Sequence, residues 1–452
     1  MNEKQLEAVK SLNNTLVIAG PGAGKTFTII NKVEYLIKNK IYKENEILLI
    51  SFTNESVNDL KKKLNYNIDI LTFHKLAIKI MQNKEYKIAN NYTLDYIINE
   101  YIESYCNKNS KAKYRLKRIL KENTLLNFKK LIATFINLYK SNYPNIYYLY
   151  DLYEKSHFIT KDYFHILLEL YTLYNNELTS NGQIDLNDLI IEATKEVENI
   201  TLPYKYIIID EFQDTSQIRF NLIKAIMTKN NAKLFAVGDD FQSIYRFSGC
   251  NLYLFLNLKN EITDLNIINL EYNYRNPKEL INIANNFIMK NKHQIPKKTK
   301  TLSCNPKPIK IYFYVNKSKV INKILEKVDN DYLVLGRNNN DKDSFNVKNE
   351  KFLTVHKSKG LEANDIILIN LENNNHSLPS KIKDHKIISK ILNKDLYPYE
   401  EERRLFYVAL TRARNNVYIL APKTNYSVFI KELLKDYGKY IEIKKNSLKR
   451  LF

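Results

Sequence analysis

The feature that most constrains this chain is a glycine loop at residues 19–26. Its sequence, AGPGAGKT, follows an apolar run at 15–18 and precedes apolar residues at helical spacing over 28–37. A strand, a glycine loop ending in Gly-Lys-Thr and a helix form a phosphate-binding loop, whose backbone N–H groups surround the phosphates at a helix N-terminus. The lysine neutralises the β- and γ-phosphates, and the threonine hydroxyl binds Mg²⁺. The loop therefore predicts a nucleotide site.

The scarcity of glycine strengthens this interpretation. The chain has 9 Gly in 452 residues, whereas average usage would give roughly 30. Three of the nine fall within five positions of the loop, where only a residue without a Cβ allows the backbone turn. Ala19 occupies the position at which the usual pattern has Gly, and the alternative interpretation is an ordinary turn between a strand and a helix.

The charge points to a polyanionic partner. The formal net charge is +21 and the pI is about 9.4. Neutralisation of phosphates favours Lys and Arg, so nucleic acid is the functional interpretation. The alternative is a coding bias, because Lys, Asn, Ile and Tyr are abundant throughout the chain and lysine would then be enriched without a function.

Length and cysteine usage indicate a multidomain protein of a reducing compartment. A chain of 452 residues predicts two or more domains. No run of 18 apolar residues is present and the first residues lack the apolar core of a signal peptide, so no membrane association is expected. The three cysteines are scattered without a CxxC pair, which argues against a zinc site or a disulfide framework and fits the cytoplasm.

Polar residues follow the apolar runs of the first part of the chain, where open α/β sheets place their ligand contacts. The runs at 46–51 and 70–71 each lead into an aromatic and polar tip, and the run at 206–209 ends in Asp210 and Glu211. Asp210 can hold Mg²⁺, directly or through water, and Glu211 can orient and deprotonate an attacking water. The alternative is an acidic turn at the end of a strand.

Residues 81–180 differ in character from their surroundings. Glycine is absent, Tyr and Lys are frequent, and apolar residues recur at helical spacing, which predicts an all-helical insertion into an α/β domain. A basic stretch at 111–121 is either a solvated helix face or a contact with the DNA backbone.

A second α/β domain is predicted from residue 265, with its first strand at 267–270. A charged helix is predicted at 400–414, and the arginines in it, a scarce residue in this chain, include Arg403, Arg404 and Arg412. Arginine suits a site that grips a transferring phosphate with a planar fork. An arginine supplied from this domain across the nucleotide cleft would couple the nucleotide state to domain closure.

Taken together, these motifs resemble the UvrD/Rep/PcrA family of superfamily 1A DNA helicases, in which Ala also begins the phosphate loop. They occur in the family's order over nearly the whole chain: Gln5, AGPGAGKT (19–26), SFTNES (51–56), TFH (72–74), IDLNDL (184–189), IDEFQDTS (209–216), VGDDFQSIYRFSG (237–249), LEYNYRNP (270–277), TVHKSKGLE (354–362) and EEERRLFYVALTRA (400–413).

The resemblance implies an α/β fold of two RecA-like P-loop NTPase domains in tandem. Domain 1A would comprise residues 1–80 and 181–264, the helical insertion 1B residues 81–180, and domain 2A residues 265–452. The implied activity is that of an ATP-dependent helicase and translocase, which moves 3′→5′ on single-stranded DNA or 3′-tailed duplex DNA in repair, replication or recombination. The implied cofactors are ATP and Mg²⁺.

The resemblance also implies roles for individual residues. The catalytic set would be Lys25, Asp210, Glu211, Gln242 as the γ-phosphate sensor, and Arg275 and Arg412 as arginine fingers. ATP would be bound by Gln5 at the adenine edge, Tyr274 and Phe27 at the ring, Glu362 at the ribose, and Ala19, Gly20, Pro21, Gly22, Ala23, Gly24, Lys25 and Thr26 in the loop. Thr26 and Asp210 would hold Mg²⁺. DNA would be contacted by Phe52, Thr53, Thr72, Phe73, His74, Tyr245, Phe247 and His356.

The chain departs from the family pattern in three places. Phe27 replaces the usual arginine beside the adenine, and Ser248 replaces an arginine that often contacts phosphate. Relatives insert a subdomain called 2B after the strand near Arg337, but only residues 338–352 lie there in this chain, which is loop length. We therefore expect a motor almost without 2B, which translocates well but unwinds long duplexes poorly by itself.

Two alternatives belong to other functional classes. The first is an ATPase or DNA-sensing subunit of a larger system, such as a Gabija-type anti-phage defence complex, with a nuclease or a repair factor as its protein partner. The second is a DNA-binding scaffold with an inactive motor. The intact motor residues argue against it: Lys25, Asp210, Glu211, Arg275 and Arg412. Few residues follow Arg412, so no fused nuclease domain is expected.

Overall fold

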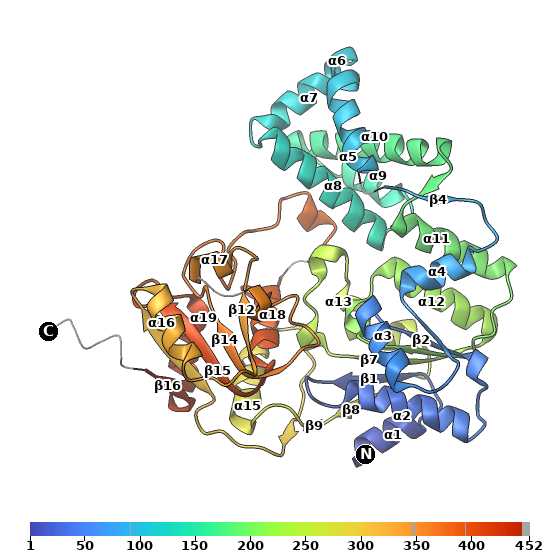
Figure 1. Ribbon diagram of the computed structural model, residues 1–452. Helices are drawn as coiled ribbons and strands as arrows, with labels where there is room; N and C mark the ends of the chain where they lie inside the picture. Colours follow the sequence, from blue (N-terminus) through green and yellow to red (C-terminus); the bar gives the residue numbers. More distant parts are fainter. Residues whose placement is uncertain (91, 346–348, 394, 445–452) are drawn as a thin grey trace.

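The computed structural model describes residues 1–90, 92–345, 349–393 and 395–444. It contains two large parallel sheets and a helical unit (Figure 1). We call the parts built on the two sheets lobe 1 and lobe 2. They lie side by side in Figure 1, with the helical unit above lobe 1. This arrangement confirms the prediction of an α/β fold with two parallel-sheet domains.

The sheet of lobe 1 has the strand order β3-β2-β6-β7-β1-β8, with every neighbouring pair parallel. Its strands read as continuous apolar runs, such as ILLI in β2 and YIII in β6, because helices cover both faces. The bounds are β1 (Thr15–Ala19), β2 (Ile47–Ile50), β3 (Asp69–Leu71), β6 (Tyr206–Ile209), β7 (Lys233–Gly238) and β8 (Asn266–Leu270).

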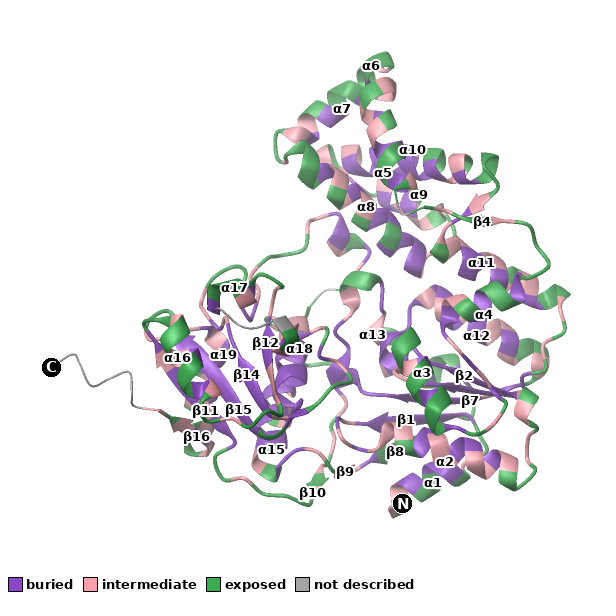
Figure 2. Ribbon diagram, viewed as in Figure 1, coloured by how far each residue is buried: buried purple, intermediate pink, exposed green. Residues whose placement is uncertain are grey.

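Alternate residues of these strands face the two helical layers. Val17 and Ala19 of β1 pack with α1, α2 and α3, whereas Leu16 and Ile18 pack with α4, α11 and α12. Figure 2 shows the buried strands between these layers. The helix bounds are α1 (Glu3–Lys10), α2 (Lys25–Lys38), α3 (Asn54–Lys63), α4 (Phe73–Ile80), α11 (Leu186–Glu196), α12 (Gln217–Asn230), α13 (Leu252–Leu256) and α14 (Leu258–Glu261).

The structure corrects one predicted boundary. The sequence analysis assigned residues 267–270 to the second domain, but β8 pairs in parallel with β1 and forms an edge of the sheet of lobe 1. An apolar run does not reveal which sheet it joins, because either sheet buries it equally well. The chain crosses to lobe 2 only after Leu270, through β9 (Tyr272–Asn273), which pairs with β10 (Lys300–Thr301).

The helical unit has a hydrophobic core to which five longer helices contribute most of the residues. Their bounds are α5 (Thr93–Glu100), α7 (Ser110–Leu120), α8 (Leu125–Asn142), α9 (Tyr147–Glu154) and α10 (Phe158–Ser180), with the short α6 (Cys106–Lys108) after a π-helical turn. The predicted all-helical stretch also contains a short strand, β4 (Lys87–Ile88), which pairs with β5 (Gln183–Ile184) at the base of the unit.

Lobe 2 has a second parallel sheet with the strand order β13-β12-β14-β15-β11-β16. Helices α15, α18 and α19 pack on one face, and α16 and α17 contribute to the core on the other. The bounds are β11 (Ile309–Tyr314), β12 (Tyr332–Gly336), β13 (Phe352–Thr354), β14 (Ala363–Leu368), β15 (Ala413–Pro422), β16 (Ile441–Ile443), α15 (Lys278–Ile288), α16 (Lys317–Leu325), α17 (Asp341–Phe345), α18 (Glu400–Leu410) and α19 (Val428–Tyr437).

A segment of lobe 2 that precedes α18 reaches the helical unit. Ile387, Ile388 and Ile391 are part of that unit's hydrophobic core, and Lys386 forms an ion pair with Glu122 at 3.1 Å. The sequence analysis did not predict this connection. It ties the helical unit to lobe 2 as well as to lobe 1.

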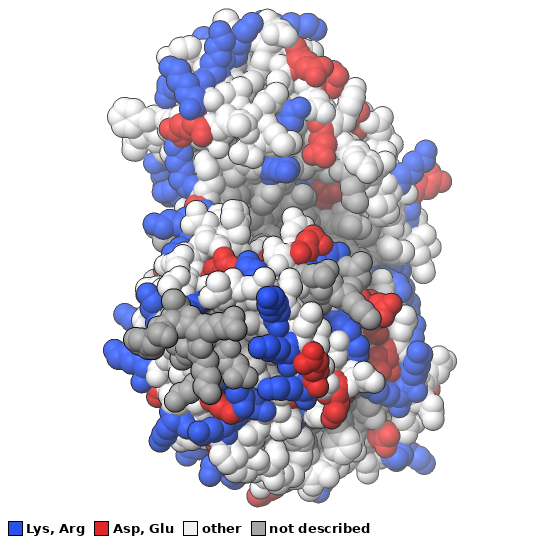
Figure 3. All heavy atoms as spheres, turned by 60° about the vertical axis from the view of Figure 1, so that its left-hand side comes forward, with Lys and Arg blue, Asp and Glu red and all other residues white. Residues whose placement is uncertain are grey.

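The surface carries many cations. Figure 3 shows Lys and Arg side chains gathered at the top of the molecule, over the helical unit. The exposed lysines of the predicted basic stretch are Lys111, Lys113, Lys117 and Lys121. Their exposure fits both interpretations of that stretch, a solvated face and a DNA contact. Within the described ranges, none of the helices combines the length and the apolar character needed to cross a membrane.

Candidate functional site

The loop between β1 and α2 takes a shape that requires glycine at two positions. Gly24, the N-cap of α2, has a φ of 81°, and a Cβ there would lie 2.8 Å from Gln5 Nε2. A Cβ on Gly22 would lie 2.5 Å from the Cβ of Arg275. Gly24 provides no side-chain cap, so the first-turn N–H groups of α2, which have no helical acceptor, can bind an anion. This geometry fits a phosphate group.

Lys25 and Glu211 form an ion pair at the end of this loop. Lys25 Nζ lies 2.7 Å from Glu211 Oε1, and Lys359 Nζ of lobe 2 lies 3.8 Å from Glu211 Oε2. Burial favours the neutral acid, but the two lysines outweigh it and hold the pKa of Glu211 well below its usual range. Glu211 is therefore ionised, as a group that takes a proton from water must be.

Asp210, the neighbouring residue, has the opposite electrostatic environment. Burial and the charge of Glu211 raise the pKa of Asp210 to about 7, although its Oδ1 accepts a hydrogen bond of 2.9 Å from the Glu211 N–H. Environments that separate the pKa values of adjacent carboxylates commonly separate their roles. A divalent cation beside Asp210 would favour its ionised form.

The donor set near the loop suits Mg²⁺. Thr26 in the first turn of α2 and Asp210 at the end of β6 would provide a hydroxyl and a carboxylate, both hard oxygen ligands. The described part of the chain contains no group of three His, Cys, Asp or Glu side chains that could hold an ion without further ligands. Mg²⁺ usually keeps water and substrate phosphates in its coordination shell, so a hydroxyl and a carboxylate beside the phosphates are protein ligands of the kind it takes.

Arg412 of lobe 2 reaches Gln242 of lobe 1. Its Nη2 donates to Gln242 Oε1 at 2.9 Å, and its other donors bind the carbonyls of Val408 and Leu361. Arg412 is 1% exposed, and burial together with Arg275 lowers its pKa to about 9. Its three acceptors are neutral, so an anion in the cleft would offset part of the cost of burying this charge.

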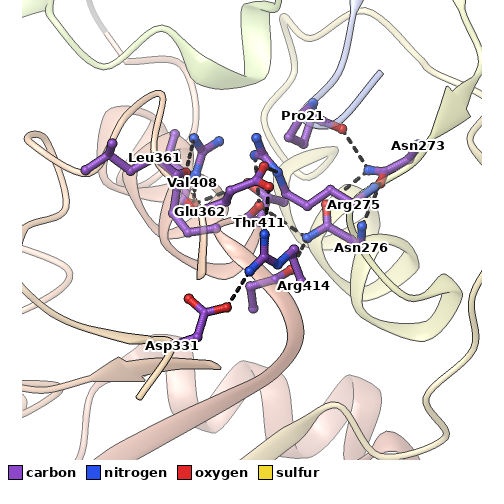
Figure 4. A network of polar contacts seen from close by, with 12 residues as sticks. Pro21, Asn273, Arg275, Asn276, Asp331, Leu361, Glu362, Val408, Thr411 and Arg414 are labelled. Carbon is purple, nitrogen blue, oxygen red and sulfur yellow. Dashed lines mark hydrogen bonds and ion pairs between the residues drawn. The ribbon is translucent and has the colours of Figure 1, made fainter. Parts of the chain in front are cut away.

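The second predicted arginine finger is held by a carboxylate. In Figure 4, Arg275 and Arg414 converge on Glu362, with Nε of Arg275 at 2.6 Å and Nη1 of Arg414 at 3.2 Å from its oxygens. Glu362 was expected to bind the ribose; here it pairs with Arg275 beside the loop. Asn273, two residues before Arg275, donates to the Pro21 carbonyl at 2.8 Å and so links this cluster to the loop.

The residues predicted at the adenine are brought together on the other side of the loop. Gln5 Nε2 donates to the Ala23 carbonyl at 3.2 Å, and Gln5 also caps α1 through Asn2. Asn2 Nδ2 donates in turn to the Tyr274 hydroxyl at 2.9 Å. The rings of Tyr274 and Phe27 are 51% and 49% exposed and thus available for stacking.

Four of the predicted DNA contacts form one aromatic cluster. Phe52 and Tyr245 stack with their planes 5° apart and their centroids 6.2 Å apart. Phe247, which is 58% exposed, packs edge-on against Tyr245 at 6.0 Å and against His356 at 5.3 Å. The Tyr245 hydroxyl donates to the His356 carbonyl at 3.0 Å. Lobe 1 supplies Phe52, Tyr245 and Phe247, and lobe 2 supplies His356, so the cluster spans both lobes.

One predicted DNA contact, Phe73, is buried in this structure. Phe73 is 3% exposed and packs in the core of lobe 1, because α4 begins at this residue and turns its ring onto the sheet. The two threonines of the neighbouring motifs cap helices: Thr53 caps α3 and the buried Thr72 caps α4. His74 is partly buried, and burial together with Arg219 lowers its pKa to about 4, so it is neutral at pH 7.

Two further cations belong to the site, and the sequence analysis missed both. The Arg219 guanidinium lies 4.9 Å from the ring centroid of Phe52, beneath the aromatic cluster. Lys359 is buried, contacts the Asp214 carboxylate and donates to the Gln242 carbonyl at 2.8 Å. Lys359 lies inside the motif at 354–362, but that motif also contains Lys357, which is exposed, and the pattern does not tell which lysine points inward.

The molecule has two parallel sheets, a phosphate loop in lobe 1 and arginines of lobe 2 beside that loop. These features define a tandem RecA-like protein of the P-loop class. Residues 1–263 match the model of the UvrD/REP helicase N-terminal domain, and residues 333–424 match that of the UvrD-like helicase C-terminal domain. The chain belongs to the UvrD/Rep helicase family, which confirms the resemblance seen in its motifs.

Several curated relatives are helicases by name. The chain is 30% identical over 354 residues to ATP-dependent DNA helicase Rep of Buchnera aphidicola subsp. Acyrthosiphon pisum, covering 74% of this chain and 52% of that protein. It is 26% identical over 492 residues to DNA helicase IV of Escherichia coli K12, covering 96% and 70%. It is 28% identical over 331 residues to ATP-dependent DNA helicase PcrA of Staphylococcus aureus Mu50, covering 70% of this chain and 43% of that protein. The matches to Rep and PcrA thus span about half of those relatives.

Proposed function

We propose that this protein is an ATP-dependent DNA helicase that uses Mg²⁺ and translocates 3′→5′ along single-stranded DNA, including the single strand of a 3′-tailed duplex. The observation that supports the proposal best is the segment 242–247 of lobe 1. Gln242 meets Arg412 at the nucleotide cleft, and Tyr245 and Phe247 belong to the aromatic cluster a few residues later. A shift of this short segment would therefore move residues at both sites.

At the nucleotide, each group of residues has a task that its geometry suits. Lys25 and the first-turn N–H groups of α2 bind the phosphates, while Gln5 and Tyr274 position the base. Glu211 orients the attacking water and accepts its proton. Arg275 and Arg412 stabilise the charge that develops on the transferring phosphoryl group. Bound Mg²⁺, held by Thr26 and Asp210, would neutralise charge on the phosphate oxygens.

At the DNA, the aromatic cluster provides stacking surfaces of little base preference, worth about 1–3 kcal/mol per base. Closure of the lobes on ATP changes the spacing between Phe52, Tyr245 and Phe247 on one lobe and His356 on the other. Bases that stack alternately on the two sides then advance along the strand. The activity belongs in repair, replication or recombination, and the three unpaired cysteines suit a reducing compartment such as the cytoplasm.

The central experiment replaces Lys25 with Ala. We expect DNA-stimulated ATP hydrolysis to be abolished, whereas salt-sensitive binding of single-stranded DNA remains, because Lys25 lies at the phosphates and not at the aromatic cluster. Lys38→Ala, at the exposed other end of α2, is the matched control and should hydrolyse ATP normally. Turnover near the wild-type rate in Lys25→Ala would overturn the proposed function.

We also propose that the helical unit corresponds to 1B, and that residues 338–352 replace the 2B subdomain. A chain without 2B lacks a surface that would hold duplex DNA, so it should translocate on single strands but unwind long 3′-tailed duplexes poorly. Translocation is measured by displacement of streptavidin from biotinylated oligonucleotides, and unwinding by strand separation. Robust unaided unwinding of a long duplex would contradict this part of the proposal.

A further inference from the structure

A buried ion cluster lies directly behind Gln242, and its cation comes from the segment that follows α15 of lobe 2. Asp239 and Asp240 follow β7 and are both 0% exposed. Lys297 Nζ contacts both carboxylates, and its side chain is only 9% exposed. Its ammonium group also lies 3.4 Å from the ring centroid of Phe241. The two buried acids thus share Lys297 as a counter-ion.

The same segment is also bound to lobe 1 by hydrogen bonds from uncharged donors to the Asp240 carboxylate. The Ile295 N–H donates to Asp240 Oδ2 at 2.8 Å, and Gln294 Nε2 donates to the same oxygen at 3.0 Å. Ile295 also packs against the core of lobe 1. The residues just before Lys297 are therefore bonded to lobe 1, which places Lys297 next to the acids.

Asp239 in turn fixes the side chain of Gln242. Gln242 Nε2 donates to Asp239 Oδ2 at 2.7 Å. An ionised carboxylate only accepts hydrogen bonds, so the amide must point its NH₂ group toward Asp239 and its oxygen toward the cleft. That oxygen is the acceptor of the 2.9 Å hydrogen bond from Arg412 Nη2. Lys297 and Gln242 thus both donate to Asp239, and Arg412 donates to Gln242, so the four side chains are linked without a conflict between donors and acceptors.

We propose that Lys297 is a positioning residue, which orients the amide of Gln242 through Asp239 and thereby keeps Arg412 aligned with the nucleotide. This inference rests on the proposed function, in which Gln242 and Arg412 act on ATP. Without Lys297, the fully buried Asp239 loses the ammonium group that it contacts, and burial then favours its protonated form. A protonated Asp239 donates to Gln242, the amide turns over, and its NH₂ group then faces Arg412, which is itself only a donor.

The test is a double-mutant cycle on ATP hydrolysis by the full chain with single-stranded DNA. Lys297→Met should lower kcat by about tenfold or more, but should change kcat by less than about twofold in a Gln242→Ala background, because residues that act as a unit are not additive. Lys290→Met is the matched control: Lys290 also lies between two acids, Glu432 and Asp436, but both are on α19 of its own lobe. It should leave kcat unchanged. An equal loss from Lys297→Met in both backgrounds would overturn the inference.

A second readout does not require turnover. Wild-type protein should bind a non-hydrolysable ATP analogue more tightly than ADP in calorimetry, and Lys297→Met should lose that preference, whereas Lys297→Arg should retain part of it. An unchanged preference in Lys297→Met would also overturn the inference. If the wild-type protein shows this preference but does not hydrolyse ATP, the proposed function is wrong. The role of Lys297 in nucleotide binding would still be supported.

The removal of one cation from a buried cluster can prevent folding. A second variant therefore separates a folding defect from the loss of the positioning role. Lys297→Met combined with Asp240→Asn keeps the net charge of the cluster, since one acid is removed together with the ammonium group. The remaining buried Asp239 still lacks its counter-ion, so burial favours its protonated form, and the same loss of kcat is expected in protein that circular dichroism shows to be folded. Normal kcat in this folded double variant would contradict the role of Lys297.

Discussion

The segment 239–247 has two sides, which the proposed function assigns to the nucleotide and to DNA, and the two are built in opposite ways. On the nucleotide side, charged groups are buried and paired: Asp239 and Gln242 are almost inaccessible, and their partners Lys297 and Arg412 come from lobe 2. On the DNA side, Phe247 is 58% exposed and touches other rings by their edges.

In the proposed function, this difference reflects the different task of each side. Charges that stabilise a transferring phosphoryl group act most strongly where water is excluded and their positions are fixed beforehand. A surface that passes many different bases needs exposed π-faces and no fixed hydrogen-bond pattern. Substitutions on the buried side should therefore alter turnover or stability, and substitutions on the exposed side should alter DNA affinity.

The largest effect is expected from Glu211→Gln. The substitution keeps the shape of the side chain but removes the base, so kcat for ATP hydrolysis should fall by about 10²- to 10⁴-fold. Binding of ATP, measured by calorimetry, should persist because Lys25 and the loop are intact. Glu192→Gln on the exposed face of α11 is the control. A kcat within a factor of two of wild type would exclude Glu211 as the base.

Lys359→Met should come next, through stability. Lys359 is buried and contacts Asp214, which is 1% exposed, so its removal leaves an unpaired buried carboxylate and should cost about 3–5 kcal/mol in the free energy of unfolding. Lys357→Met, at the exposed lysine two residues earlier, should cost little. Urea denaturation compares the two variants, and equal stabilities would show that Lys359 is not a paired buried charge.

Two of the phenylalanines predicted to contact DNA, the buried Phe73 and the exposed Phe247, allow the buried and the exposed surface to be tested separately. Phe73→Ala should destabilise the protein by about 3–5 kcal/mol, because it empties part of the core of lobe 1. Phe247→Ala should leave stability unchanged and weaken single-stranded DNA binding by about 1–3 kcal/mol. Thermal unfolding and fluorescence anisotropy measure the two quantities. A stable Phe73→Ala variant with weakened DNA binding would show that Phe73 contacts DNA rather than supporting the core.

The smallest effect is a pH dependence caused by Asp210. Burial raises the pKa of Asp210 from 3.8 to about 7 and that of Asp214 to about 6, so the folded state binds more protons than the unfolded chain in between. The free energy of unfolding should therefore fall as the pH rises from about 4 to about 7. Glu211 acts in the opposite sense, but only below its ordinary pKa of 4.5.

The matched variants for this prediction are Asp210→Asn and Asp59→Asn, the latter at an exposed aspartate of α3. Asp210→Asn should remove the part of the slope between about pH 6 and pH 7 in urea denaturation, and Asp59→Asn should not. An unchanged slope in Asp210→Asn would mean that Asp210 titrates normally.

Much of this architecture follows from local sequence. The phosphate loop, the apolar strands and the acids after β6 were predictable because each depends on residues next to one another in the chain. Long-range choices were not: β8 joins the sheet of lobe 1, and three isoleucines before α18 enter the core of the helical unit. The burial of Phe73 depends on where α4 begins, and Lys297 lies in a segment without any motif. Such contacts are decided by packing between distant segments, which a single sequence does not display.

The most direct test of the account is steady-state ATP hydrolysis by the full chain and by its Arg412→Ala variant, each with and without single-stranded DNA. The account predicts strong stimulation of the wild type by DNA and loss of that turnover in Arg412→Ala, with ATP still bound. Turnover by Arg412→Ala equal to that of the wild type, or a wild type that DNA does not stimulate, would contradict the claim that the two lobes act together on one nucleotide.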